Sequence, residues 1–131
     1  MKNALEVYVG ERLIFHSDGR WLHPLFDLER FLREAYIDPA TLLVRDKIVG
    51  RAAALLLIYL GAGTVEAGIL SRLGQEILER YEVPYRYDTL VDRIDCRTEQ
   101  ILHDETDPHR AVRLLRRLAE GTDERLREDL Q

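Results

Sequence analysis

The sequence predicts an α/β fold in which an N-terminal β-hairpin precedes helices and strands that alternate along a mixed, mostly parallel sheet. Two short β-rich runs flank a Gly-Glu pair near the start, and apolar residues then recur at alternating helical and strand periods. Because successive βα units form right-handed crossovers, their strands run parallel with helices on the faces of the sheet. We expect one domain over residues 1–120 and a charged C-terminal tail over 121–131.

The first predicted elements are the hairpin and a helix. Residues 5–9 and 12–16 are rich in β-formers, and Gly10 stands at the first position of the two-residue loop between them. His23-Pro24 opens a helix, because proline lacks the N–H group that the first turn leaves unpaired. Apolar residues at positions 25, 28, 31, 32 and 35 continue it at helical spacing.

Two strand–helix units follow. Residues 41–44 form a short apolar strand, Asp46 caps a helix over 47–60, and Gly61 ends that helix. Residues 64–70 form the next strand, after which Ser71 caps a helix over 72–81.

The last third of the chain is less regular. Pro84 makes the run 83–87 an edge strand or the start of a strand. Residues 88–94 are expected to form a short helix or turn, and the pattern assigns no element to 96–106. Asp107-Pro108 begins a final helix that continues to about residue 120.

Composition excludes several classes of protein. A formal net charge of -5 over 131 residues argues against a general nucleic-acid binder, which needs a basic surface. Cys96 is the one cysteine, so no intramolecular disulfide forms, as is usual in a reducing compartment. The longest apolar run, 48–60, is too short to cross a membrane. We therefore expect a cytoplasmic protein that does not contact membranes.

Polar residues gather where ligands bind in α/β sheets, beyond the carboxyl ends of the strands. Ser17 and Gly19 follow the second strand, Asp46 and Lys47 the third, and Ser71 the fourth. The predicted helix starts at 47 and 71 direct backbone N–H groups into the same cleft, which favours an anion. Gly50 and the three alanines after Arg51 let the helix backbone approach a ligand or the sheet closely.

Two interpretations of Asp46-Lys47 stay open. In one, Asp46 is a helix cap and Lys47 is a solvated side chain. In the other, they form a polar pair at the cleft, and burial lowers the pKa of Lys47 toward that of a general base.

No metal or cofactor is expected. His103-Asp104-Glu105 matches the H-x-E half of a zinc deaminase signature, but the P-C-x-x-C half is absent. Gly61-x-Gly63 follows a helix rather than a strand, so the dinucleotide fingerprint fails. Cys96 fits an idle or buried thiol better than a nucleophile.

Three segments resemble a known family. They are Ser17 through Pro24-Leu25, Asp46-Lys47-x-x-Gly50-Arg51-Ala52-Ala53, and Ile69-Leu70-Ser71. Together they resemble an uncharacterised prokaryotic family, known only as a domain of unknown function, with a cytidine-deaminase-like fold. The resemblance covers residues 5–115 and implies a three-layer α/β/α architecture. It places the deaminase zinc ligands near 20–25 and 46–50, where this chain carries no zinc motif, so it implies a deaminase-like scaffold without deaminase chemistry.

The same resemblance assigns a meaning to the segment after the last strand. Members of the family tend to carry Asn-Arg and then Cys-Pro-Met-Glu there. Cys96-Arg97-Thr98-Glu99 is a shortened version of this pattern that keeps Arg97 and Glu99 and places Cys96 at the asparagine position.

Three functional hypotheses follow. The first is a domain that binds a small anionic or nucleotide-like ligand in a zinc-free cleft. The second is a non-zinc enzyme in which Lys47 acts as base or electrophile and Asp46 orients it. The third is a structural partner, such as a homo-oligomer, with a vestigial cleft and an interface over 55–60. The residues expected to line the cleft are Ser17, Gly19, Asp46, Lys47, Gly50, Arg51, Ser71, Arg97 and Glu99.

Overall fold

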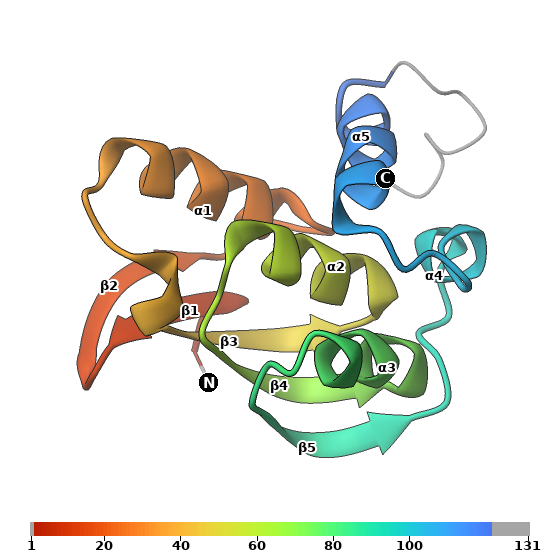
Figure 1. Ribbon diagram of the computed structural model, residues 1–131, viewed down its shortest axis with the longest axis horizontal. Helices are drawn as coiled ribbons and strands as arrows, with labels where there is room; N and C mark the ends of the chain where they lie inside the picture. The colour runs from red at the N-terminus through yellow and green to blue at the C-terminus, as the bar shows by residue number, and fades with distance from the viewer. Residues whose placement is uncertain (1, 122–131) are drawn as a thin grey trace.

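The computed structural model describes residues 2–121. Its strands and helices alternate after an N-terminal hairpin (Figure 1). In chain order they are β1 (Leu5–Val9), β2 (Arg12–Ser17), α1 (His23–Glu34), a 3₁₀ turn (Pro39–Thr41), β3 (Leu42–Val49), α2 (Arg51–Leu60), β4 (Thr64–Ser71), α3 (Arg72–Arg80), β5 (Tyr85–Val91), α4 (Arg97–Ile101) and α5 (Pro108–Ala119). The predicted class, α/β with alternation in a mixed sheet, is confirmed.

The strands form one five-stranded sheet in the order β2-β1-β3-β4-β5. β1 is antiparallel to both neighbours, whereas β3, β4 and β5 run parallel. Each helical crossover therefore moves the chain in the same direction across the sheet. Because such crossovers are right-handed, α1, α2 and α3 all lie on the same face of the sheet (Figure 1).

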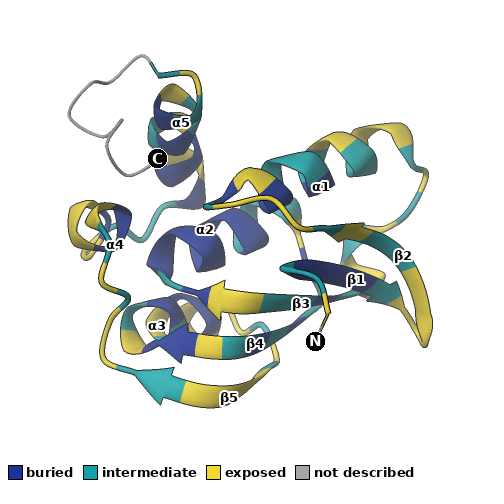
Figure 2. Cartoon of the chain, turned by 180° about the vertical axis from the view of Figure 1, so that it is seen from behind, coloured by how far each residue is buried: buried dark blue, intermediate teal, exposed yellow. Residues whose placement is uncertain are grey.

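The core lies between this face and the helices. Leu5, Val7, Val44 and Val65 project from β1, β3 and β4 into it and are fully buried. α2 is buried from Arg51 to Leu57, because it lies between the sheet and α5 and contacts α1 and α3 at its sides (Figure 2). The layers thus run from the sheet through α1–α3 to α5.

The opposite face of the sheet is polar. Arg45, Glu66 and Arg86 project from neighbouring strands there and are exposed or half-buried. Within residues 2–121, no helix covers this face over β3–β5.

The predicted start of α2 is wrong. The strand continues through Asp46 and Lys47 to Val49, and the helix begins only at Arg51, after Gly50. Asp46 is therefore a strand residue and not the helix cap. The continued pairing of β3 with β4 as far as Val49 explains the longer strand.

The region after Pro84 also differs from the prediction. β5 runs from Tyr85 to Val91, so residues 88–91 extend the strand where a short helix or turn was expected. Its position at the sheet edge is confirmed. Residues 96–106, left unassigned from sequence, contain the short helix α4.

Other predicted boundaries agree within a few residues. Ser71 caps α3, Asp107 caps α5, and Gly61 ends α2 with a φ of 81°. Leu55, Leu56 and Leu57 are buried in the core, so the interface expected over 55–60 is wrong for these three residues. Apart from Gly121, the predicted tail lies outside the described residues. No helix in the described part of the chain is long and apolar enough to span a membrane.

Candidate functional site

A hollow of about 240 Å³ lies where the starts of α1 and α2 meet the segment before α4. These three segments are far apart in sequence and come together only in the folded chain. Most of the lining is apolar or small. The lining residues are Trp21, Leu22, Ile48, Gly50, Ala52, Ala53, Ile94, Cys96, Thr98 and Glu99.

Glu99 is the charged residue of this hollow. Its side chain reaches the first turn of α2, where the backbone N–H of Arg51 donates to its carboxylate at 2.6 Å. The N–H of Ile94 donates to the other carboxylate oxygen at 2.8 Å. Glu99 is only 2% exposed. It thus caps α2, whose own N-cap residue, Gly50, has no side chain.

Gly50 makes this contact sterically feasible. A Cβ atom at position 50 would lie 2.9 Å from Oε1 of Glu99, closer than such atoms approach in proteins. The small side chains of Ala52 and Ala53 leave the rest of the hollow open on the side of α2. The glycine and alanines singled out in the sequence therefore shape the hollow.

Trp21 forms part of the opposite wall. Its backbone has a φ of 55°, in the left-handed region that residues other than glycine rarely adopt. Its indole N–H is buried and has no hydrogen-bond partner among the described residues. Strained backbone and unpaired buried polar groups both tend to occur at functional sites.

Cys96 stands at the rim with its sulfur 3.3 Å from the hydroxyl oxygen of Thr98. The cysteine is half-buried, and Thr98 is buried. This contact fixes the turn that leads into α4 and so helps to position Glu99.

Asp46 and Lys47 do not form a polar pair. Successive residues of a strand point to opposite faces, so Asp46 faces the helices while Lys47 lies exposed on the other face. Desolvation of the half-buried Asp46 carboxyl raises its pKa to about 7, against the lowering effect of the N–H groups of Ile48 and Lys47. Neither residue lines the hollow.

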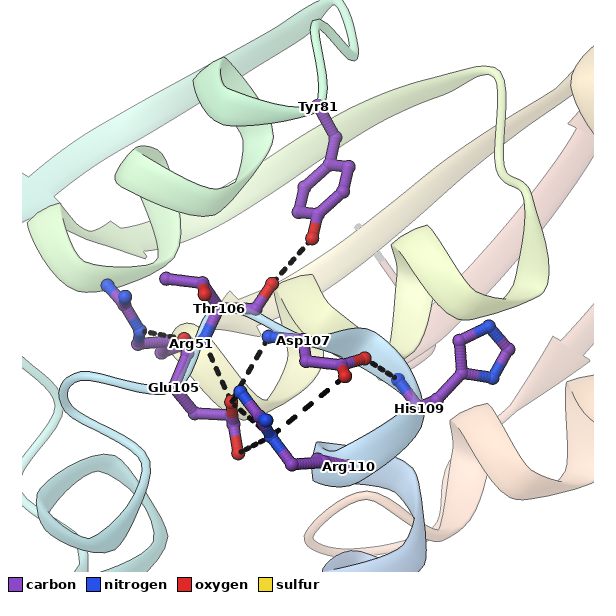
Figure 3. Close-up of polar contacts among 7 residues, drawn as sticks. All are labelled: Arg51, Tyr81, Glu105, Thr106, Asp107, His109 and Arg110. Carbon is purple, nitrogen blue, oxygen red and sulfur yellow. Dashed lines mark hydrogen bonds and ion pairs between the residues drawn. The ribbon is translucent and has the colours of Figure 1, made fainter.

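Arg51 does not offer its charge to the hollow either. The residue is 3% exposed, and its guanidinium donates to the carbonyls of Glu105 (2.8 Å) and Leu73 (3.1 Å) and to the carboxylate of Glu76 (2.8 Å). Figure 3 shows it directed toward the loop before α5. The predicted role of Arg51 as a cleft cation is therefore wrong, and the residue anchors this loop to α2.

That loop is held by a second group of contacts (Figure 3). The Glu105 carboxylate accepts from the N–H groups of Thr106 and Asp107 and from Arg110, which together hold its pKa below the usual value against the opposing effect of burial. The Tyr81 hydroxyl donates to the carbonyl of Thr106. These contacts fix the path between α4 and α5.

The other predicted residues lie outside the hollow. The Ser17 hydroxyl is 3.4 Å from the Asp27 carboxylate and accepts from the N–H of Gly19. Ser71 is fully buried and caps α3 by accepting from the N–H of Gly74 at 2.9 Å. Arg97 is exposed. Of the predicted ligand residues, the structure brings Gly50 and Glu99 into the hollow.

A zinc ion does not fit the residues at the two helix starts. Zinc prefers thiolate and imidazole ligands. His23 begins α1, and Cys96 and Glu99 line the hollow, but these side chains do not form a group that could hold a metal ion. Across residues 2–121, no three His, Cys, Asp or Glu side chains are grouped so that they could hold a metal ion.

Sequence reasoning missed Trp21 and Ile94. A lone tryptophan between two predicted elements gives no periodic signal, and Ile94 acts through its backbone N–H. Both become recognisable only once the three segments are known to meet.

Comparisons with known proteins place the chain. A family model described as "TM1506: Domain of unknown function (DUF1893)" matches residues 2–118. The crystal structure of the DUF1893 family protein TM1506 from Thermotoga maritima is 27% identical. The match covers 86% of this chain and 78% of that one, with a TM-score of 0.75. No curated protein matches. The chain therefore belongs to the DUF1893 family, a family of unknown function.

Proposed function

We propose that this domain binds a small, flat, neutral or cationic heterocycle in the hollow between α1, α2 and α4. The observation that carries the proposal is the buried carboxylate of Glu99 in an otherwise apolar site. Ligand pockets typically combine apolar walls with a few placed polar groups. At about 240 Å³ the hollow is smaller than the pockets of drug-sized ligands, so it suits a single ring.

The polar groups define the chemistry of the ligand. A carboxylate has about four acceptor positions, and the N–H groups of Arg51 and Ile94 occupy two of them. The remaining positions suit ligand N–H groups such as those of an amidine or an aminopyrimidine. The unpaired indole N–H of Trp21 suits a ligand acceptor.

The sequence favoured an anionic ligand, but the charges around the hollow do not support one. The first turn of α2 already holds an anion, the Glu99 carboxylate, and the cations Lys47 and Arg51 do not line the hollow. A phosphate there would face Glu99 without a neutralising partner.

We also propose that the domain is a zinc-free relative of the cytidine-deaminase-like fold. The strand order 2-1-3-4-5 and a hollow at the starts of two consecutive crossover helices support this assignment. The lack of fitting zinc ligands there argues for binding rather than metal-assisted deamination.

The test is calorimetric titration with single-ring heterocycles that carry an amidine-type edge, and with their phosphorylated counterparts. Glu99→Gln should weaken binding by at least about tenfold, because it replaces an acceptor with a donor. Trp21→Phe replaces the indole with a smaller aromatic ring that lacks the N–H, and should weaken binding less. Ser71→Ala is the matched control, since it removes a cap at the same sheet edge without touching the hollow. Binding that survives Glu99→Gln, or that requires the phosphate, contradicts the proposal.

A further inference from the structure

The open face of the sheet carries a row of alternating charges. Glu6 on β1, Arg45 on β3, Glu66 on β4 and Arg86 on β5 stand directly opposite one another in the strand register. Arg45 lies 3.8 Å from the Glu6 carboxylate and 3.3 Å from that of Glu66, which Arg86 also contacts. The row therefore reads negative, positive, negative, positive across four strands.

A second, shorter row runs beside it. Lys47 on β3, Gly68 on β4 and Asp88 on β5 lie two residues further along their strands. Lys47 and Asp88 are exposed, and neither has a side-chain ion pair within residues 2–121. Gly68 has no side chain, so the two rows enclose a hollow of about 460 Å³.

We propose that this face docks a second copy of the chain through a two-fold axis parallel to the strands, between β3 and β4. In the second copy, such an axis places the strands in the reverse order across the interface. Each residue keeps its position along the strand direction. A reversed negative-positive-negative-positive row is its own complement. Arg45 of one copy then faces Glu66 of the other. Arg86 lies opposite the position of Glu6, whose side chain is only 6% exposed and contacts Asn3, Tyr8 and Arg45 of its own chain. Isologous contacts of this kind define two-fold dimers.

The shorter row supports the same arrangement. Lys47 lies over Gly68 of the second copy, beside Asp88 of that copy. Its side chain thus enters the hollow that Gly68 leaves, and two charges that lack partners in one chain acquire them in the dimer. The next row on the other side, with Leu13, Tyr8 and Leu43, is partly exposed and adds apolar contact.

The charge balance selects this partner over others. The two rows together hold three cations and three acids, so the face is neutral (the cations are Arg45, Lys47 and Arg86, and the acids Glu6, Glu66 and Asp88). A nucleic acid requires a net basic surface. A surface whose charges alternate instead favours a partner with the same alternation in reverse.

The test is sedimentation velocity on untagged protein across a range of concentrations at low and high salt. The wild type should form dimers that weaken as salt rises, because rim charges are screened. Lys47→Asp and Asp88→Lys should each raise the dimer dissociation constant by at least about tenfold, because each places like charges opposite one another. The matched control is Arg113→Asp, the same change of charge at an exposed position of α5, which should leave the dimer intact.

The most informative measurement is the association of the two variants when they are mixed. Each variant alone has two repulsive contacts, whereas a heterodimer of Lys47→Asp with Asp88→Lys has two attractive ones. The mixture should therefore associate, and so should the double variant. A wild type that stays monomeric, a dimer that both variants leave unchanged, or a mixture that fails to associate overturns the proposal. Thermal unfolding should be nearly unchanged in both variants, since both side chains are exposed.

Discussion

Helices α2 and α3 begin at the same edge of the sheet, each after a parallel strand, but their first turns are capped differently. The hydroxyl of Ser71, the residue that immediately precedes α3, accepts from the N–H of Gly74. α2 has Gly50 at that position and is capped by Glu99, 48 residues away from Arg51. The local cap serves one helix. The distant cap also connects the start of α2 to the segment before α4 and places a carboxylate in the hollow.

The difference indicates which of the two helix starts can serve a purpose besides folding. When the residue before a helix caps its first turn, no distant residue is needed to accept from those N–H groups. A helix that lacks one leaves an anion-binding first turn, which a distant residue or a ligand can occupy. In this protein the residue that fills it is Glu99, which is also the charged residue that lines the hollow.

The largest effect is expected from Glu99→Ala. The substitution leaves the buried N–H groups of Arg51 and Ile94 without an acceptor, which should lower the free energy of unfolding by about 3 kcal/mol. Urea denaturation measures this loss. Glu99→Gln keeps one acceptor and should lose less. A loss no larger than that of Ser71→Ala would show that the distant cap is not the stronger one.

Gly50→Ala tests the steric side of the same cap. The added Cβ lies 2.9 Å from Oε1 of Glu99, so the carboxylate has to move away from the first turn of α2. We expect a loss of about 2 kcal/mol in unfolding free energy together with loss of ligand binding. Gly19→Ala is the control, because its backbone does not need a positive φ and the added Cβ would meet Pro24 only at an ordinary contact distance of 3.4 Å. Retained binding in Gly50→Ala would contradict this account of the hollow.

Asp46→Asn tests the residue that sequence favoured as the cap of α2. The folded pKa of about 7 is above the unfolded value of about 3.9, so the folded state holds a proton that the unfolded state has released between these values. Stability should therefore fall as pH rises from about 4 to 7.

Asparagine does not ionise, so Asp46→Asn should flatten this pH dependence and stabilise the protein by about 1–2 kcal/mol at pH 8. Urea denaturation at pH 4 and pH 8 measures it. A variant that is less stable than wild type at pH 8 would show instead that the ionised carboxylate, which accepts from the N–H of Ile48, stabilises the folded state.

The smallest effect belongs to Ser71→Ala. Removal of a local cap typically costs about 1 kcal/mol, and ligand binding should not change because Ser71 does not line the hollow. Thermal unfolding and titration together check both statements. Weakened binding in this variant would mean that the two helix starts are coupled.

The same comparison explains what the sequence could predict. The caps Ser71 and Asp107, the C-terminal Gly61 and the hairpin turn depend on a few neighbouring residues, and they were predicted correctly. Asp46 was misassigned because a capping residue followed by small residues is typical of a helix start. Cross-strand pairing that extends β3 to Val49 is invisible in the local pattern.

The candidate site was predicted only in part for a related reason. Gly50 was identified because glycine is unfavourable inside the helix predicted over 47–60, and Glu99 through the family resemblance. The hydrogen bond that brings Glu99 to the first turn of α2 joins residues 48 positions apart, so the local sequence does not reveal it. Lys47 and Arg51 had the right charge for a cleft, but strand alternation and burial direct them elsewhere.

Because the crossovers all run in the same direction, the helices α1–α3 lie on one face of the sheet and leave the other face open. This open face has a practical consequence for protein engineering. Because Asn3 already contacts Glu6 on the open face, any segment fused ahead of β1 emerges beside that face. An affinity tag at that end would compete for the surface, so a C-terminal tag is the better choice. For the same reason, an amphipathic helix grafted there has the shortest route to becoming a second cover for the sheet.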